Sequence, residues 1–128
     1  MPDLLFPNPI VADPAIIHDN EEFQVQWAAV NTTKKSIESF HDRLVIRSVP
    51  EGCPGSSDQE HPVVFDSDVD GDEADFTEPD LPAGSVGPLM QPFVGPFAAG
   101  SYELRVTLDN DMGRGDETFI CIDIQKSN

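Results

Sequence analysis

The residues most able to do chemistry form an acidic run between Asp66 and Asp80. The run reads Asp-Ser-Asp-Val-Asp-Gly-Asp-Glu from Asp66 to Glu73. Carboxylates at alternate positions, with a glycine at the sixth, allow the chain to curl around a hard cation such as Ca²⁺, which takes six to eight oxygen ligands. The candidate metal ligands are Asp66, Asp68, Asp70, Asp72 and Glu78.

The second half of this run departs from the pattern of a twelve-residue calcium loop. The bidentate glutamate is due at the twelfth position, where Thr77 stands, and Glu78 comes one residue late. The residues Val63–Phe65 before the run look like a strand rather than a helix. The alternative is a solvated acidic loop, in which eight carboxylates repel one another with no basic residue among them. Ca²⁺ binding and the solvated loop both stay open at this point.

The sequence offers little for catalysis. His18, His41 and His61 lie in separate segments, and neither a His-x-x-His nor a Gly-x-Ser-x-Gly spacing occurs. Cys53 lies eight residues before His61, but an acidic segment disfavours the thiolate that a cysteine nucleophile needs. Carboxylate pairs are available for glycoside hydrolysis, yet a chain of 128 residues leaves no room for an elaborated cleft. We therefore predict that the protein is not an enzyme.

The length and net charge of the chain limit the number of domains and the kinds of partner that we expect. A chain of 128 residues fits one domain over residues 1–128. The formal net charge of −17 repels phosphate backbones and anionic lipid, so we predict no nucleic-acid partner. No apolar run approaches the ~20 residues that span a bilayer, which predicts no membrane insertion. Cys53 and Cys121 leave one disulfide and two free thiols as alternatives.

Alternation of apolar and polar residues predicts short strands. Phe23, Val25 and Trp27 alternate with glutamines, and Tyr102 begins a second segment of the same period. Strands are expected at 4–6, 21–31, 43–49, 63–65, 89–93, 102–109 and 117–124. Lys34–Phe40 could form only one or two helical turns and is expected to be a loop.

These strands predict an all-β fold. Pro and Gly turns separate them, and no helix is available for the crossover of a dozen or more residues that parallel strands need. We expect a single antiparallel sandwich or barrel of about seven strands, with a long acidic loop around residues 50–80. Trp27 is expected in the core, and Tyr102 is expected to bury its ring while its hydroxyl caps a backbone group.

Several stretches, taken in order, resemble one known family. Pro2-Asp3-Leu4, the turn Leu81-Pro82-Ala83-Gly84-Ser85, and the strand Ala99-Gly100-Ser101-Tyr102-Glu103-Leu104 followed by Asp109 and Asp116-Glu117-Thr118 carry the likeness. The chain is similar over nearly its full length to bacterial CARDB modules, the cell-adhesion-related domains found in bacteria. It departs from them in Thr32-Thr33, where Thr-Gly is usual, and in the long acidic insertion between Pro50 and Asp80.

The resemblance implies a single antiparallel immunoglobulin-like β-sandwich of about seven strands that serves as a surface module without catalysis. The resemblance names no ligand, and we expect the partner to be a protein or a surface glycan. The expected mechanism is recognition through loops and sheet edges, at the cell surface or outside the cell, with Ca²⁺ as a possible stabiliser of the acidic loop. The alternative is a structural subunit of a larger assembly, of the phage decoration or fibre type, that docks copies of itself or a neighbour.

Overall fold

Strands make up most of the regular structure. The computed structural model describes residues 3–50, 52, 61–108 and 115–127, which form twelve strands, one α-helix and one 3-10 helix. The strands are β1 (Leu4–Leu5), β2 (Val11–Asp13), β3 (Ile17–His18), β4 (Phe23–Gln26), β5 (Val30–Asn31), β6 (Phe40–His41), β7 (Arg43–Ser48), β8 (Val63–Asp66), β9 (Thr77–Glu78), β10 (Phe93–Val94), β11 (Gly100–Thr107) and β12 (Glu117–Gln125). The helices are α1 (Ser67–Asp70) and η1 (Glu73–Phe76).

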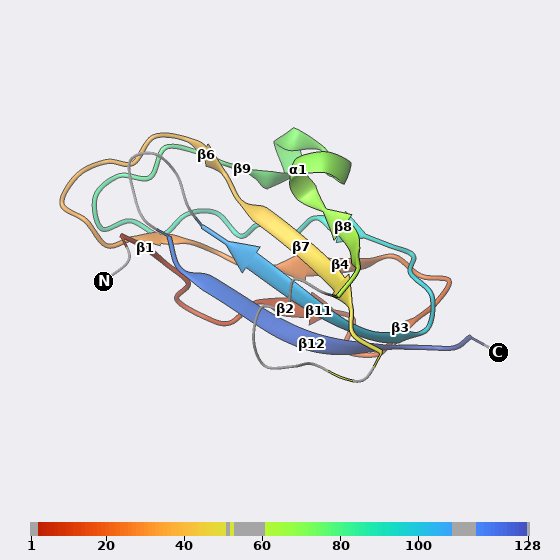
Figure 1. Cartoon of the computed structure of the whole chain (residues 1–128). Helices are drawn as coiled ribbons and strands as arrows, with labels where there is room; N and C mark the ends of the chain where they lie inside the picture. The colour runs from red at the N-terminus through yellow and green to blue at the C-terminus, as the bar shows by residue number, and fades with distance from the viewer. Residues whose placement is uncertain (1–2, 51, 53–60, 109–114, 128) are drawn as a thin grey trace.

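The larger layer is a five-stranded sheet in the order β3-β12-β11-β7-β8 (Figure 1). The central strand β11 runs antiparallel to β12 and to β7, so that Tyr102 lies beside both Ile122 and Ser48. Its period-two pattern sends Leu104 and Val106 to the inner face, where both are fully buried. The predicted inward positions of this strand are therefore confirmed, although Glu103 and Arg105, which alternate with them, are buried as well.

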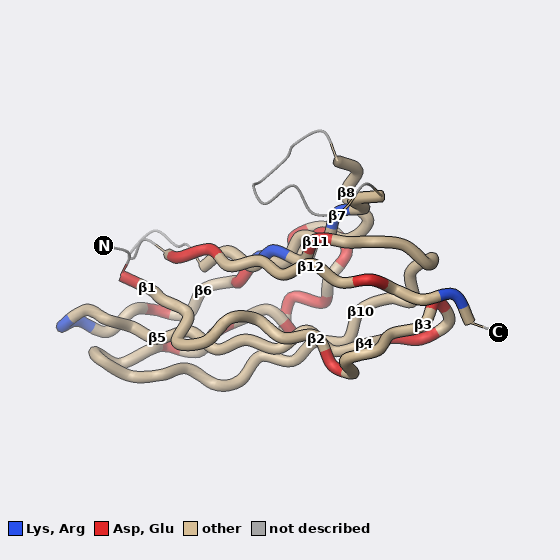
Figure 2. The backbone as a smooth tube through the Cα atoms, turned by 90° about the horizontal axis from the view of Figure 1, so that it is seen from below, with Lys and Arg blue, Asp and Glu red and all other residues tan. Residues whose placement is uncertain are grey.

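The second layer consists of the three-stranded sheet β10-β4-β2 and the pair β1-β5. Figure 2 shows the two layers edge-on, one above the other. The core between them contains Trp27, which is 2 % exposed, as the sequence predicts. Tyr102 also behaves as expected, because its hydroxyl donates to the carbonyl of Ala98 at 2.7 Å while its ring packs on Phe97.

The pair β6-β9 lies where the chain changes partners. Phe40 is paired with Glu78, and the next step of the ladder is a bond from the backbone N–H of Asp42 to the carbonyl of Phe76 at 2.8 Å. Directly after Asp42 the chain becomes β7 and joins the five-stranded sheet. Asp42 therefore stands at the junction between the β6-β9 pair and the larger layer.

Three features differ from the sequence predictions. The all-β class is confirmed, but the described residues form twelve strands instead of about seven, because long predicted strands are interrupted where they change partners. The expected segment 21–31, for example, is divided between β4 and β5. The fully antiparallel arrangement is wrong for one pair, since β3 runs parallel to β12 with Ile17 beside Ile124. That pair needs no helical crossover because nearly the whole domain connects its two strands.

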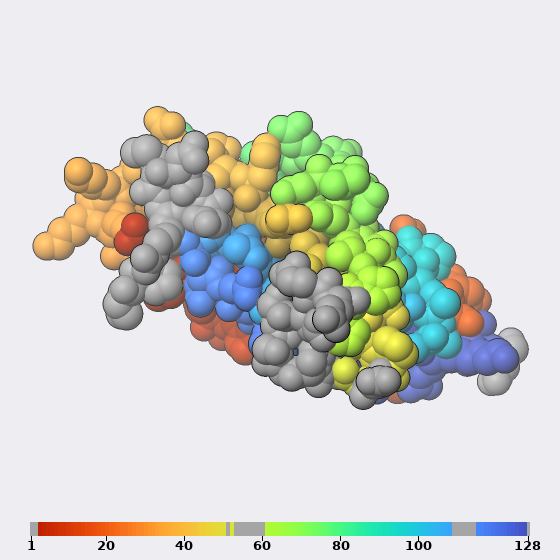
Figure 3. Space-filling model, viewed as in Figure 1, coloured from red at the N-terminus to blue at the C-terminus, as the bar shows by residue number. Residues whose placement is uncertain are grey.

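The acidic region of residues 50–80 is the third difference. Its described part contains β8, α1, η1 and β9, where a loop was expected. Figure 3 shows β8, α1 and η1 in green, gathered along one side of the larger sheet next to β7. No helix in the described part of the chain is long and apolar enough to cross a membrane. Cys121 is disulfide-bonded, and Cys53 lies outside the described residues.

Candidate functional site

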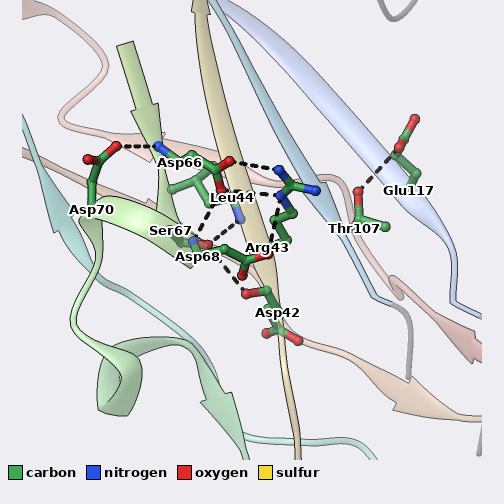
Figure 4. Close-up of polar contacts among 9 residues, drawn as sticks. All are labelled: Asp42, Arg43, Leu44, Asp66, Ser67, Asp68, Asp70, Thr107 and Glu117. Carbon is green, nitrogen blue, oxygen red and sulfur yellow. Dashed lines mark hydrogen bonds and ion pairs between the residues drawn. The ribbon is translucent and has the colours of Figure 1, made fainter. Parts of the chain in front are cut away.

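The acidic run that follows β8 folds into two short helices. Asp66 is the N-cap of α1, and its side chain accepts a hydrogen bond from the backbone N–H of Asp68 at 3.1 Å. Asp72 caps η1 in the same way, accepting from Ala74 at 3.1 Å. Asp70 reaches back to the N–H of Asp66 at 2.9 Å (Figure 4). These carboxylates satisfy backbone donors at helix ends, which is the usual role of Asp at an N-cap.

Arg43 of β7 neutralises part of this acidic run. Its Nη2 lies 2.7 Å from Oδ2 of Asp66, its Nε lies 3.2 Å from Oδ1, and Asp68 is 3.4 Å from Nε. The bond from Arg43 holds the pKa of Asp66 below its usual value. Ser67 adds a second anchor, because its Oγ accepts from the backbone N–H of Leu44 at 2.9 Å. Together these contacts fix α1 against β7 (Figure 4).

The five predicted calcium ligands do not converge. Asp66, Asp68 and Asp70 belong to α1 and its cap, Asp72 caps η1, and Glu78 is fully buried. Within the described part of the chain, no group of three or more His, Cys, Asp or Glu side chains is placed to hold a metal ion. Ca²⁺ binding by this set stays one of the two alternatives that the sequence left open, and it would require the acidic run to rearrange.

Glu78 and Asp42 are two buried carboxyl groups that the sequence analysis did not single out as a pair. Both residues are 0 % exposed. Oδ2 of Asp42 accepts a hydrogen bond from the indole Nε1 of Trp27 at 2.6 Å. Oδ1 of Asp42 and both carboxyl oxygens of Glu78 have no hydrogen-bond partner among the described residues. Burial, followed by the nearby carboxyl of Glu78, raises the pKa of Asp42 to about 8, and burial raises that of Glu78 to about 7.

On the outer side of the β6-β9 pair, three side chains form a chain of contacts. Nε2 of His41 lies 2.9 Å from the carboxylate of Glu73, and its Nδ1 lies 2.9 Å from the hydroxyl of Thr77. Thr77 donates its hydroxyl proton to the carbonyl of Glu73 at 2.7 Å. The hydroxyl is therefore an acceptor toward His41, and this geometry does not activate Thr77 as a nucleophile.

The outer face of the second layer carries almost no charge. Strands β4, β5 and β10 contain no acidic or basic residue, and β2 contributes only Asp13. Figure 2 shows the tubes of β4 and β5 in tan along their length, although the chain has a net charge of −17. We call this surface the uncharged face. Its exposed side chains are Val11, Asp13, Val86, Leu89, Gln91 and Phe93, and Gln24 and Gln26 are partly exposed.

The strand register places these side chains in rows. Phe93 pairs with Gln24, and the next bridge pairs Trp27 with Met90, so Gln26 lies opposite Gln91. The amide of Gln26 donates to the side-chain oxygen of Gln24 at 3.0 Å. Phe93 stands at one end of this row of amides with 64 % of its surface exposed. An aromatic ring next to uncharged hydrogen-bonding groups is the chemistry of a binding surface.

A signal for this face is present in the sequence. The segments 4–12, 23–33 and 81–102 contain no Asp, Glu, Lys or Arg, whereas charged residues are 24 % of the whole chain. The three segments supply β1, β4, β5 and β10 and most of β2. No sequence motif marks this face, because its distinguishing property is missing charge over long stretches.

Comparisons with known proteins support only the fold. No protein-family model matches the chain, so the resemblance to CARDB modules stays a prediction. No curated protein matches it either. Among solved structures, the chain is similar to a β-glucosidase from Erythrobacter marinus with a TM-score of 0.57 and 13 % sequence identity. The match covers 92 % of this chain and only 15 % of that enzyme.

Proposed function

We propose that this protein is a non-enzymatic, immunoglobulin-like binding module that holds a neutral polysaccharide on its uncharged face. The observation that carries the proposal is that, in a chain with a net charge of −17, the strands β2, β4, β5 and β10 contain one charged residue, Asp13, and their outer face exposes Phe93 beside partly exposed glutamines. Such a module works outside the cell or at its surface, where polysaccharides are found.

The chemistry of the face suits sugar rings. The apolar side of a pyranose packs on an exposed aromatic ring, and Phe93 offers one. Sugar hydroxyls are both donors and acceptors, and glutamine amides provide both roles without charge. Gln24 and Gln26 are already oriented by their mutual hydrogen bond, which reduces the entropy lost when a ligand binds.

Charge selects between kinds of partner. An anionic polymer would be repelled by the acidic surface that surrounds the face. A second copy of the chain would bring two bodies of net charge −17 together, which also opposes association. A neutral polymer is not subject to either of these electrostatic repulsions. The similarity to part of a β-glucosidase, an enzyme that acts on glucosides, is compatible with a module that works next to carbohydrate.

A second candidate is a structural subunit of a larger assembly. It is favoured by the apolar side chains of the same face, since Val11, Val86, Leu89 and Phe93 are each more than half exposed. Contiguous exposed apolar groups often mark a protein interface. In that case the uncharged face would be covered by a neighbouring subunit rather than by sugar.

Affinity electrophoresis tests the proposal. The protein is run through native gels that contain hydroxyethyl cellulose, laminarin or, as an anionic comparison, alginate. We expect retardation in at least one neutral gel and none in alginate. Phe93→Ala and the double variant Gln24→Ala/Gln26→Ala should lose the retardation. Val64→Ala removes an exposed apolar group from β8 in the other layer and should behave as the parent does.

The two candidates give different results. Equal mobility in all gels, with no effect of Phe93→Ala, overturns the polysaccharide proposal. Sedimentation velocity at increasing concentration tests the second candidate. Stoichiometric oligomers that Phe93→Ala dissociates would establish the subunit role instead.

A further inference from the structure

The register of the β6-β9 pair brings two carboxyl groups together inside the protein. Phe40 lies opposite Glu78, and Asp42 lies one hydrogen-bonded step further along, opposite Phe76. Side chains alternate along a strand, so the side chains of Phe40, Asp42, Phe76 and Glu78 share the inner side. Asp42 and Glu78 are diagonal neighbours on that side, a relation in which side chains still interact.

Among the described residues, neither carboxyl group has a positively charged partner. Oδ2 of Asp42 accepts from the neutral indole of Trp27, and Oε2 of Glu78 lies so near Gly87 that a Cβ on this glycine would be 3.5 Å away. Three of the four carboxyl oxygens have no hydrogen-bond partner among the described residues. An ionised pair in this setting would be desolvated without compensation.

The basic side chains nearby are held elsewhere. His41 and Arg43 flank Asp42 in the sequence, but they are about half exposed and contact Glu73 and Asp66. Lys34 and Lys35 are exposed. The other basic residue of β7, Arg47, lies further along the strand beside Val63 and Glu103. The remaining charged groups on the adjoining segments 36–39 and 68–80 are acidic: Glu38, Asp68, Asp70, Asp72, Asp75 and Asp80. Those groups add negative potential and so favour the neutral form of the buried pair.

We propose that Asp42 and Glu78 form a proton-binding pair that keeps the β6-β9 pair packed on Trp27 below neutral pH and loosens it as the pair ionises. The proton supplies the positive charge that no side chain provides. This inference concerns the inner side of the fold and does not depend on the polysaccharide proposal.

The sign of the effect follows from the direction of the pKa shifts. Both folded-state pKa values, about 8 for Asp42 and about 7 for Glu78, lie above the ordinary values of 3.8 and 4.5. The contribution to stability is complete below the ordinary values and is lost as the pH rises through the folded values. In that window the folding equilibrium constant should fall about tenfold per pH unit for each proton that only the folded state holds. The pair is expected to titrate as a unit because its members interact.

Direct titration of the parent protein is the primary test. Carboxyl ¹³C chemical shifts of Asp42 and Glu78, followed by NMR from pH 4 to 9, should show apparent pKa values well above those of the exposed carboxyls. Two values below 5 would overturn the proposal without any variant being made.

Variants test the coupling to stability. The melting temperature of the parent should fall steadily from pH 5 to pH 8.5. Glu78→Gln and Asp42→Asn remove one charge each with little change of shape and should flatten this profile. Asp123→Asn, on the outward side of β12, is the matched control and should keep it. A melting temperature of the parent that does not change with pH contradicts the inference. So does a decrease with pH that persists in the double variant Asp42→Asn/Glu78→Gln.

A bound metal ion is the alternative to a proton for neutralising Asp42 and Glu78. Melting temperatures measured with and without calcium distinguish the two. If 1 mM CaCl₂ at pH 8.5 restores the melting temperature of the parent but not that of Glu78→Gln, the pair is a metal site and the proton assignment is overturned. If EDTA and CaCl₂ leave the profile unchanged, the proton assignment stands.

Discussion

The indole nitrogen of Trp27 donates a 2.6 Å hydrogen bond to Oδ2 of Asp42 in the interior of the protein. Trp27 belongs to the second layer, and Asp42 precedes the first residue of β7 in the larger sheet. The bond therefore joins the two layers at the point where the chain enters the larger sheet. Trp27 also stacks on Phe76 with ring centroids 6.1 Å apart, which places the β6-β9 pair in the same cluster.

Trp27→Phe should destabilise the fold. The change keeps an aromatic ring but leaves a second oxygen of Asp42 without a partner, and an unsatisfied buried group costs about 1–3 kcal/mol. Urea denaturation at pH 6 measures the loss. Asp42→Asn is the control, because its side-chain oxygen can still accept from the indole and the cost should be smaller. Equal stability of Trp27→Phe and the parent would show that the hydrogen bond contributes nothing.

Asp66→Ala should weaken the anchoring of α1. The variant loses the N-cap and the ion pair to Arg43, and cap removal costs about 0.5–2 kcal/mol. Asp66→Asn keeps the cap and loses the charge, so it should fall between Asp66→Ala and the parent. Thermal denaturation of the three proteins gives the order.

The lowered pKa of Asp66 predicts that the stability of the fold also depends on pH in the acid range. The pKa of Asp66 is lowered by Arg43 below the ordinary 3.8, so its contribution is present above that value and is lost as the pH falls through the folded pKa. The melting temperature of the parent should therefore drop more steeply below pH 4 than that of Asp66→Asn. An identical decrease of melting temperature below pH 4 in the parent and in Asp66→Asn would refute this assignment.

Gly71→Ala should destabilise the turn between α1 and η1. A Cβ at this position would lie 2.7 Å from Cε2 of Phe76 and 2.9 Å from the carbonyl oxygen of Ser67. Phe76 is buried and cannot move away freely, so the expected cost is about 1–3 kcal/mol, as for other overpacked sites. Gly84→Ala is a useful comparison, because its φ of +69° strains alanine while its surroundings are open. A smaller loss for Gly71→Ala than for Gly84→Ala would contradict the steric explanation.

Calcium titration tests the ligand set predicted from the acidic run. We expect no saturable heat in calorimetry at pH 6, because Arg43 and backbone donors already engage Asp66, Asp70 and Asp72. Occupancy at a hundredfold excess over the Kd would stabilise the fold by about 2.7 kcal/mol. A one-to-one binding isotherm that Asp70→Asn abolishes would restore the calcium prediction and show that the run rearranges around the ion.

Local alternation predicted the long strands well. The inward positions of β11, the burial of Trp27 and the hydroxyl contact of Tyr102 all follow from the period of two and the chemistry of the side chains. The parallel pairing of Ile17 with Ile124 could not be predicted in this way, because it joins strands at opposite ends of the sequence.

The acidic run shows where pattern reasoning fails. Alternate carboxylates from Asp66 to Asp72 suggest a metal loop, but the same residue type is also the preferred helix N-cap. Which role prevails depends on Arg43, which is distant in the sequence and near in space. Spacing alone groups Glu78 with those residues, yet its strand register places it on the same side as Asp42.

The edge of the larger sheet has a consequence for solubility. An edge strand such as β8 exposes backbone donors and acceptors that could template another chain. Here the strand is only four residues long, its register with β7 shifts between Ile46 and Arg47, and it turns at once into α1 with its carboxylates. Shortness, irregularity and like-charge repulsion together oppose amyloid growth by strand addition at this edge.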